Sequence, residues 1–342
     1  MKKEASIGIV LPYFGKLPDC FPLFLESVKN NPTIDWILYT DDDSIQDYPS
    51  NVKLHKISFE EFKEKLQESY DFPICVNKPY KLCDFKPTWG ETLKEDLRDY
   101  DFWGCCDCDL IFGNIRKFIT KQVTDKYQKI LECGHLILWR NVSDVNEYYR
   151  IQQYIDYRTV LGSEENFVFD EERGIGGFWR NDNKLCWREL CYDDICVGND
   201  DFRITKSIPG GFIGPYLVGD RNETQEFQKM KNIIYAYSKG TLKRMWIQRG
   251  KIHTEEVLYV HLQKRKMCVE DGLKYEAGFL IVPNSFIGLT ELTVKEHKTL
   301  APGRFNLRNY LRLWYEIATC EMKFWGSAEW KEKSAIKFII GK

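Results

Sequence analysis

The sequence predicts an α/β protein with a mainly parallel central sheet. Over the first hundred residues, short apolar runs rich in β-branched and aromatic side chains alternate with amphipathic segments of helical spacing. A strand that helices cover on both faces is apolar along nearly its whole length, as these runs are. At 342 residues, the chain is long enough for one large domain or two modest ones.

The first elements form a β-α-β unit. Residues 6–11 and 35–40 are β-rich and predict strands, and between them residues 18–30 repeat apolar side chains at helical spacing. A third strand is expected over residues 52–57, and Ser58 with Glu61 forms the capping-box pattern that opens a helix to about residue 68.

Further elements follow along the chain. A second amphipathic helix over residues 88–100 leads into the buried strand 100–106. Beyond that strand we expect a short helix at 112–118, a strand at 134–139, a helix at 143–157, a hairpin at 233–248 and a strand at 257–261. Residues 174–219 mix glycines and aromatics without a clean period, which is typical of long loops that form a binding wall.

Charge and composition exclude several classes of protein. The net charge of −2 gives no basic field for nucleic acid, and no stretch approaches the length of a membrane span. The apolar run at the N-terminus ends at Pro12, which fits a first strand better than a signal peptide. The twelve cysteines are not spaced as zinc ligands and suit reduced thiols, so we expect a cytoplasmic protein.

Asp107 and Asp109 follow the buried strand directly. The loops at the carboxyl ends of parallel strands form the ligand crevice, so an acidic pair there is well placed to hold a divalent cation against a phosphorylated ligand. Asp101 is the rival acid, but it begins the strand and would point away from that crevice.

Two stretches resemble a known family. Residues 81–87 and 101–114, which include the Asp107-Cys108-Asp109 motif, are similar to the core of bacterial polysaccharide glycosyltransferases (capsule, lipopolysaccharide and O-antigen) with the GT-A fold and a DXD motif. Gly134-His135-Leu136 and the run from Tyr259 to Arg265 extend the similarity over residues 5–270.

The resemblance implies a fold and a division of the chain. The fold would be the Rossmann-like GT-A fold of nucleotide-diphospho-sugar transferases, with a mixed central sheet, flanking helices and a C-terminal helical tail. Residues 1–270 would form the transferase domain, divided into a nucleotide-binding half (1–115) and an acceptor half (116–270). Residues 271–342 would be an extension of aromatic and basic helices.

The resemblance also implies a metal-dependent hexosyltransferase. Mn²⁺ or Mg²⁺ would be held by Asp107, Asp109 and His261, and Asp107 could also touch the ribose of the donor. His135 competes with His261, although its place at a strand start favours packing. The donor would be a nucleotide-diphosphate sugar, with a UDP-sugar expected most.

Further residues are candidates for donor binding. At the ends of the first two strands, Tyr13 or Phe14 could stack on the base while Thr40 or Asp41 bonds a base edge. Charged residues elsewhere would meet the sugar and the pyrophosphate. The donor-binding set is Pro12, Tyr13, Phe14, Thr40, Asp41, Lys81, Asp84, Lys86, Asp107, Lys264 and Arg265.

An inverting transferase needs a carboxylate as general base for the acceptor hydroxyl. Asp170 and Glu171, before a glycine-rich run, are the candidates for this catalytic role, and Glu164 and Glu165 are their rivals on the same segment. The choice between retention and inversion stays open.

The last segment and the acceptor suggest the partners. Residues 301–342 carry eight Lys or Arg, four Asp or Glu and eight aromatics, which suits either a helix packed on the main domain or a peripheral contact at the inner face of the plasma membrane. The acceptor would be a glycan or a lipid-linked oligosaccharide. Two alternatives stay open: a sugar nucleotidyl- or phosphotransferase, and a non-catalytic glycan-binding protein with the same fold.

Overall fold

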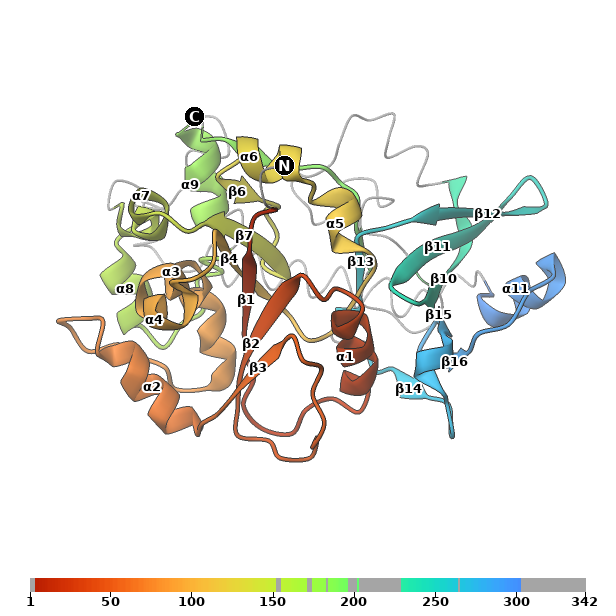
Figure 1. The fold of residues 1–342 in the computed structure, drawn as a ribbon, viewed down its shortest axis with the longest axis horizontal. Coiled ribbons are helices and arrows are strands. Elements are labelled where there is room, and N and C mark those ends of the chain that lie inside the picture. The colour runs from red at the N-terminus through yellow and green to blue at the C-terminus, as the bar shows by residue number, and fades with distance from the viewer. Residues whose placement is uncertain are drawn as a thin grey trace.

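A computed structural model describes residues 4–151, 155–170, 174–182, 184–195, 202, 229–263 and 265–302. It is a mixed α/β structure with several sheets and flanking helices (Figure 1). The expected α/β class is therefore confirmed. The tail from residue 303 onward lies outside the described residues, and so do Glu171 and Lys264.

The central sheet has the strand order β3-β2-β1-β4-β7-β6-β8. β1 (Ile7–Pro12), β2 (Ile34–Thr40), β3 (Val52–Lys56) and β4 (Phe102–Cys106) are parallel to one another. β7 (Leu136–Arg140) pairs antiparallel with β4 and with β6 (Lys129–Ile130), and β8 (Cys186–Trp187) pairs parallel with β6. The sheet is therefore mixed, with a parallel half and a half that contains antiparallel pairs.

Alternating side chains of the parallel strands supply two separate cores. Ile9 and Leu11 face a cluster with α1 (Phe21–Lys29), whereas Val10 faces the cluster on the opposite side of the sheet. That second cluster holds α2 (Phe59–Gln67) through Phe62 and Leu66. Helices thus cover both faces, as expected for a parallel sheet.

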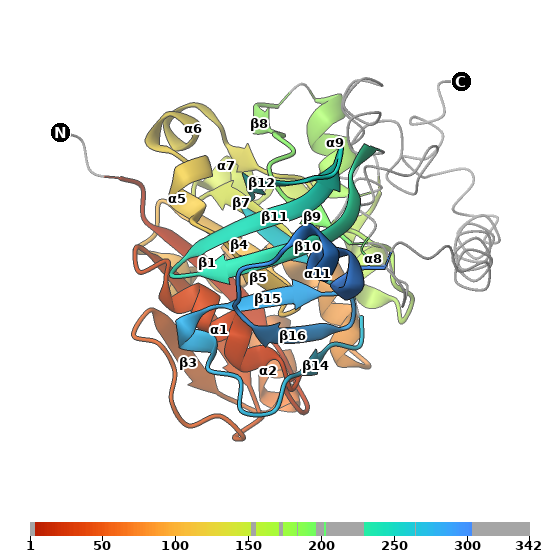
Figure 2. The same cartoon turned by 90° about the vertical axis from the view of Figure 1, so that its right-hand side faces the viewer.

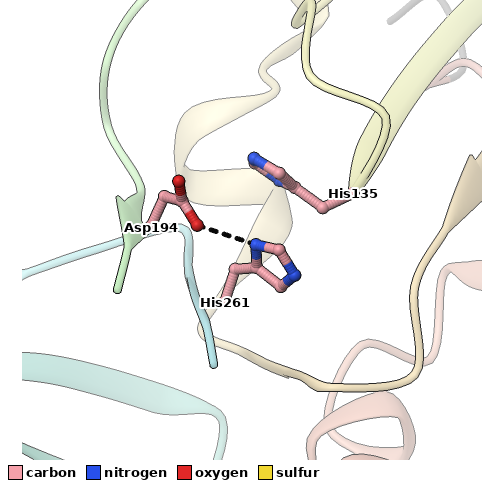
Figure 3. Close-up of side chains that lie close together, drawn as sticks. All are labelled: His135, Asp194 and His261. Carbon is pink, nitrogen blue, oxygen red and sulfur yellow. Dashed lines mark hydrogen bonds and ion pairs between the residues drawn. The ribbon is translucent and has the colours of Figure 1, made fainter. Parts of the chain in front are cut away.

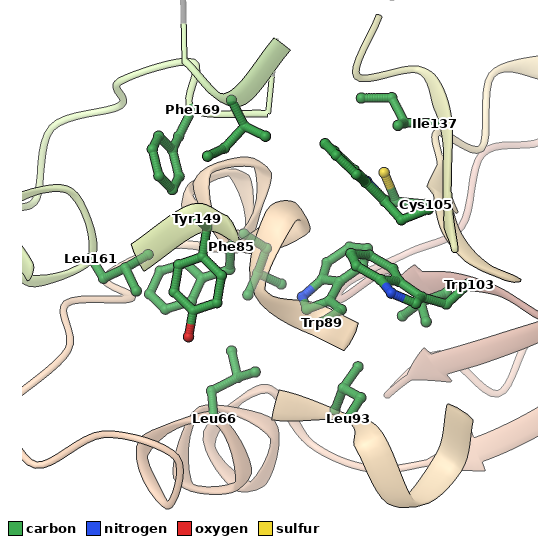
Figure 4. Packing of buried hydrophobic residues seen from close by; sticks show 14 of the residues in the cluster. Leu66, Phe85, Trp89, Leu93, Trp103, Cys105, Ile137, Tyr149, Leu161 and Phe169 are labelled. Atoms are coloured by element: carbon green, nitrogen blue, oxygen red, sulfur yellow. The ribbon is translucent and has the colours of Figure 1, made fainter. Parts of the chain in front are cut away.

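The second core is rich in aromatic rings. Figure 4 shows Trp89 and Trp103 packed beside Phe85, Cys105 and Tyr149. The elements that surround it are η1 (Pro79–Thr88), α3 (Trp89–Thr92), α4 (Lys94–Leu97), η2 (Tyr148–Arg150), α8 (Tyr157–Gly162) and α9 (Ile175–Asn181).

Two expected helices are shorter than the sequence predicts. The helix over residues 88–100 breaks at Leu93, whose φ of −115° and ψ of 27° leave the helical region between α3 and α4. The helix over 143–157 ends early, because α7 (Ser143–Asn146) is tied at Asn146 to Trp103 Nε1 (2.7 Å) and to the carbonyl oxygen of Gly90 (3.2 Å). Tertiary hydrogen bonds override the local period in this segment.

A second sheet stands beside α1 (Figure 2). Its order is β12-β11-β10-β15-β16-β14, and α11 (Val294–Leu300) follows it. The strands are β10 (Lys231–Ser238), β11 (Thr241–Gln248), β12 (Lys251–Glu256), β14 (Cys268–Val269), β15 (Phe279–Val282) and β16 (Ser285–Gly288). Residue 270, the expected end of the transferase domain, falls inside this sheet because β15 pairs with β10. Residues 279–288 are strands where the sequence predicts helices.

A small third sheet joins the two larger ones. β13 (Tyr259–His261) lies between β5 (Leu110–Phe112) and β9 (Asp193–Asp194). After β5, α5 (Ile115–Phe118) and α6 (Lys121–Lys126) lead to β6. Since β5 directly follows Asp109, this small sheet brings distant parts of the chain to the end of β4.

Candidate metal centre

Asp107 and Asp109 lie at the carboxyl end of β4. The backbone fixes both: Asp107 N donates to the carbonyl oxygen of His135 (3.1 Å), and Leu262 N donates to the carbonyl oxygen of Asp109 (3.0 Å). The loop between β4 and β5 therefore has a defined shape, with the two carboxylate side chains 36% and 26% exposed.

His261 ends β13 and reaches the same place. Its register partner in the antiparallel pair is Leu110, the residue after Asp109. His261 Nε2 lies 3.4 Å from Asp109 Oδ1 and 4.0 Å from Asp107 Oδ2. The structure thus brings together the three residues that the sequence suggests as metal ligands.

These distances fit a single divalent cation. Two ligand atoms that each lie about 2.1 Å from one octahedral ion are about 3.0 Å apart when adjacent and about 4.2 Å apart when opposite. Carboxylates suit Mg²⁺ and Mn²⁺, an imidazole is a ligand of the transition-metal type, and the partly exposed carboxylates can be reached by ligand oxygens.

The electrostatics around His261 also favour a cation. Burial lowers the pKa of this imidazole, but the negative charges of Asp109 and Asp194 outweigh burial and raise the pKa to about 10. These carboxylates therefore stabilise positive charge at the position of the imidazole.

Two residues beside His261 were not in the predicted ligand set. Asp194 Oδ1 lies 2.8 Å from His261 Nδ1, and the ring centroids of His135 and His261 are 4.5 Å apart. Figure 3 shows the three side chains close together. His135 Nδ1 is bonded to Tyr259 OH (2.8 Å), and burial together with the charge of His261 lowers the pKa of His135 to about 3. His135 is therefore neutral near pH 7.

His135, Asp194 and His261 form a second cluster that could hold a metal. It differs from the first in its burial and in the nitrogen of His261 that it uses. All three residues are buried, and Asp194 faces Nδ1 rather than Nε2. A phosphorylated ligand could reach the acidic pair more easily than this interior cluster.

Lys86 connects the acidic pair to Asp170. Its ammonium donates to Asp107 Oδ1 (2.8 Å) and to the carbonyl oxygen of Gly134 (2.8 Å), and it lies 3.2 Å from Asp170 Oδ2. Asp170 is only 4% exposed, and burial raises the pKa of its carboxyl group to about 6 although Lys86 counteracts this. Asp170 therefore borders the site, one lysine away from Asp107.

Lys81 and Asp84 serve the interior of the protein. Their side chains are buried and paired at 2.9 Å. Lys81 also donates to the carbonyl oxygens of Val160 (2.8 Å) and Glu165 (2.5 Å), while Asp84 accepts the backbone N–H groups of Phe167 and Phe169. The pair thus connects η1 to the segment before Asp170. Because both side chains are buried, they are not exposed for binding a nucleotide sugar in this structure.

The ends of β1 and β2 lie side by side, as the parallel register requires. Tyr13 is partly buried, and burial together with the nearby Cys108 and Asp109 raises the pKa of its hydroxyl, which places it near the acidic pair. Asp41 is exposed and accepts a hydrogen bond from Gly15 N (2.7 Å). Tyr13 therefore lies beside the candidate metal centre, and Asp41 is exposed at the end of β2.

Of three other donor-binding candidates, Phe14 and Thr40 are buried and Pro12 is partly buried. Phe14 packs against Phe59 and Phe62 with ring centroids 5.2 and 5.3 Å apart, and Thr40 is fully buried at the end of β2. Pro12 ends β1, where its backbone pairs with Tyr39.

Four further residues were candidates or rivals in the sequence. Arg265 is buried, donates to Asn284 Oδ1 (3.0 Å) and lies over the ring of Phe202 (4.9 Å). Glu164 and Glu165 are exposed. Asp101, the rival acid, accepts Ser6 N (2.8 Å) and Ser6 Oγ (2.9 Å) at the opposite end of β4.

Asp194 could have been found from the sequence by one signal. Asp193-Asp194 is an acidic pair that directly follows an aromatic residue, Tyr192, whereas Asp107-Cys108-Asp109 follows an apolar run that ends at Cys106. The strand that carries Asp194 has only two residues and lies in a segment that the sequence predicts as long loops. The parallel pairing of β9 with β13, which places Asp194 opposite His261, could not be predicted from so short a strand.

The fold and the site together define a mixed α/β protein with a candidate metal centre at the edge of its central sheet. Residues 9–290 match the model of a family of unknown function (DUF6625), and the chain belongs to that family. Among curated proteins, none matches the sequence. Within the described part of the chain, every helix is too short or too polar to cross a membrane.

Proposed function

We propose that this protein is a metal-dependent glycosyltransferase with the GT-A fold, which transfers a sugar from a nucleotide-diphosphate donor to a glycan acceptor. The observation that carries the proposal is the convergence of Asp107, Asp109 and His261 at the carboxyl end of β4. The resemblance to bacterial polysaccharide glycosyltransferases rests on the same residues.

The strand order of the central sheet supports nucleotide binding at the carboxyl ends of β1 and β4. From β1 the chain proceeds through β2 and β3 on one side and then returns to β4 on the other, so the order reverses between β1 and β4. In open α/β sheets ligands bind outside the carboxyl ends of the strands at such a reversal. Tyr13 follows β1 and Asp107 follows β4, so both border that crevice.

The residues around the site suit the departure of a nucleoside diphosphate. Asp107, Asp109 and His261 would hold Mn²⁺ or Mg²⁺, which when bound neutralises the diphosphate leaving group. Lys86 binds Asp107 Oδ1 and so leaves Oδ2 on the side of His261 Nε2. Tyr13 offers a ring for stacking on the base, and a UDP-sugar is the donor that we expect.

Asp170 is the residue that we propose for activation of the acceptor. Its raised pKa, near 6, is suitable for a general base that takes a proton from the acceptor hydroxyl. Its partner Lys86 would have to release it for that role, because Asp170 is closed off from solvent here. A glycan or lipid-linked oligosaccharide at the cytoplasmic face of the membrane is the acceptor we propose.

Release of nucleoside diphosphate tests the proposal. Purified protein is incubated with a panel of sugar nucleotides and Mn²⁺, and we expect slow release of the nucleoside diphosphate from one of them even without an acceptor. Asp109→Asn should reduce this release to background. Asp101→Asn is the matched control, because Asp101 precedes the same strand and its carboxylate accepts hydrogen bonds from Ser6 N and Ser6 Oγ, at the end of β4 opposite to the acidic pair.

Two results would contradict the proposal. Release of pyrophosphate would instead indicate a nucleotidyltransferase. Lack of turnover with every sugar nucleotide, combined with retained glycan binding, would indicate a non-catalytic glycan-binding protein.

A further inference from the structure

The imidazole of His261 has two nitrogens with different surroundings. Nε2 faces the half-exposed carboxylates of Asp107 and Asp109, whereas Nδ1 faces the buried carboxylate of Asp194 at 2.8 Å. A neutral imidazole carries its proton on one nitrogen and offers a lone pair on the other, so the partner at Nδ1 decides what Nε2 can do.

Asp194 is held firmly in its place. It is 6% exposed, and the parallel pairing of β9 with β13 sets its backbone opposite His261. Gln263 Nε2 lies 2.7 Å from both Asp194 Oδ1 and Oδ2. A carboxylate that is buried and fixed by an amide donor can only accept hydrogen bonds, so it requires a proton on His261 Nδ1.

We propose that Asp194 is the positioning residue of the metal centre: it accepts the Nδ1–H of His261 and thereby turns the Nε2 lone pair toward the cation between Asp107 and Asp109. This inference rests on the proposed function, since it assumes that this centre binds the metal. Partners of this kind fix the tautomer and the ring plane of ligand histidines, and their loss typically weakens metal affinity about 10- to 100-fold.

The rival interpretation is a metal bound by Asp194, His135 and His261 Nδ1. The contacts favour the positioning role, because both oxygens of Asp194 are already bonded by Gln263 and His135 Nδ1 is bonded to Tyr259 OH. Each group of the interior cluster is buried and has a partner within the protein, whereas the carboxylates of the acidic pair, although Asp107 pairs with Lys86, are partly exposed to solvent.

Binding of Mn²⁺ without any nucleotide tests the role of Asp194. Free Mn²⁺ is measured by electron paramagnetic resonance during titration of the purified full chain. We expect Asp194→Asn to bind Mn²⁺ about 10- to 100-fold more weakly than the wild type. Gln263→Ala, which only loosens Asp194, should weaken binding less but in the same direction.

Two controls separate positioning from general damage to the fold. Tyr259→Phe removes a buried hydrogen bond of the same strand without touching His261, so its affinity for Mn²⁺ should equal that of the wild type. The rise of Tm on addition of Mn²⁺ should be smaller in Asp194→Asn, because at a fixed Mn²⁺ concentration the stabilisation by the ligand rises with the logarithm of its affinity.

The outcomes are distinct. If Asp194→Asn and Gln263→Ala bind Mn²⁺ as tightly as the wild type, the positioning role is wrong and the proposed function stands. If Asp194→Asn does not fold, the affinity of Gln263→Ala decides in the same way. If Asp109→Asn binds Mn²⁺ normally while Asp194→Asn does not bind it, the interior cluster is the metal site and the positioning role is wrong. If the wild type does not bind Mn²⁺, the metal centre fails and the proposed function with it.

Discussion

Lys86 is buried, and its contacts explain how the protein accommodates a buried positive charge. Its ammonium group donates hydrogen bonds to Asp107 Oδ1 and to the carbonyl oxygen of Gly134, and it lies 3.2 Å from Asp170 Oδ2. Burial lowers the pKa of this lysine, but the charges of Asp107 and Asp170 outweigh burial and raise it. A buried cation of this kind is stable only while its partners are in place.

The pH dependence of stability should report on Asp170. Its pKa is about 6 in the folded protein against an ordinary value of 3.8, so between roughly pH 4 and pH 6 the folded state binds more protons than the unfolded state. The carboxylate's contribution to the free energy of unfolding therefore falls as pH rises through this window. Asp170→Asn removes that titration.

Urea unfolding at several pH values between 4 and 7 measures this effect. The free energy of unfolding of Asp170→Asn, minus that of the wild type, should increase as pH rises. A difference that is constant or decreases would show that Asp170 is not a buried carboxyl with a raised pKa.

The sequence was sufficient for part of the site. Asp107 and Asp109 could be placed because they follow an apolar strand, whereas His261 was suggested by the resemblance to glycosyltransferases. The pairing of Lys81 with Asp84 could not be foreseen, since burial of two charges depends on their complete surroundings. Their spacing of three residues is equally common on exposed surfaces.

Gly104 lies in the middle of β4, where the neighbouring strand approaches closely. A Cβ atom at this position would overlap the carbonyl oxygen of Ile137 and Cδ2 of Leu138 in β7. The strand that carries the acidic pair thus needs a residue without a side chain at this point.

Gly104→Ala should destabilise the protein by about 1–3 kcal/mol, the usual cost of overpacking a core. Urea unfolding measures the change in free energy. Gly162→Ala in α8 is the matched control, because its Cβ would meet only the carbonyl oxygen of Pro73, at an ordinary 3.6 Å. If the two variants are equally stable, Gly104 does not lie as close to Ile137 and Leu138 of β7 as the structure shows.

Elements near the N-terminus were easier to predict than later ones. The capping box of Ser58 and Glu61 is present as expected, because a cap depends on residues only three apart. β15 and β16 escaped prediction, and the helices at 88–100 and 143–157 were predicted too long. Strand pairing and helix ends in these regions depend on contacts with distant residues.

At the scale of the whole molecule, the small sheet β5-β13-β9 assembles the site from distant segments. Its strand β9 carries two acidic residues that contact different parts of the protein. Asp194 is hydrogen-bonded to His261, and Asp193 forms an ion pair with Arg244 of the second sheet at 2.6 Å. Tyr235 OH also bonds Asp193, at 3.0 Å. The candidate metal centre is therefore connected to the second sheet, and a sequence read locally does not reveal this connection.

The central claim is that Asp107, Asp109 and His261 Nε2 bind one cation. Crystals grown with Mn²⁺ and a nucleoside diphosphate test it most directly, through anomalous scattering at the manganese absorption edge. We predict one peak between these three groups, with diphosphate oxygens on its open side. A peak among His135, Asp194 and His261 Nδ1, or the absence of a peak at both clusters, would contradict the account.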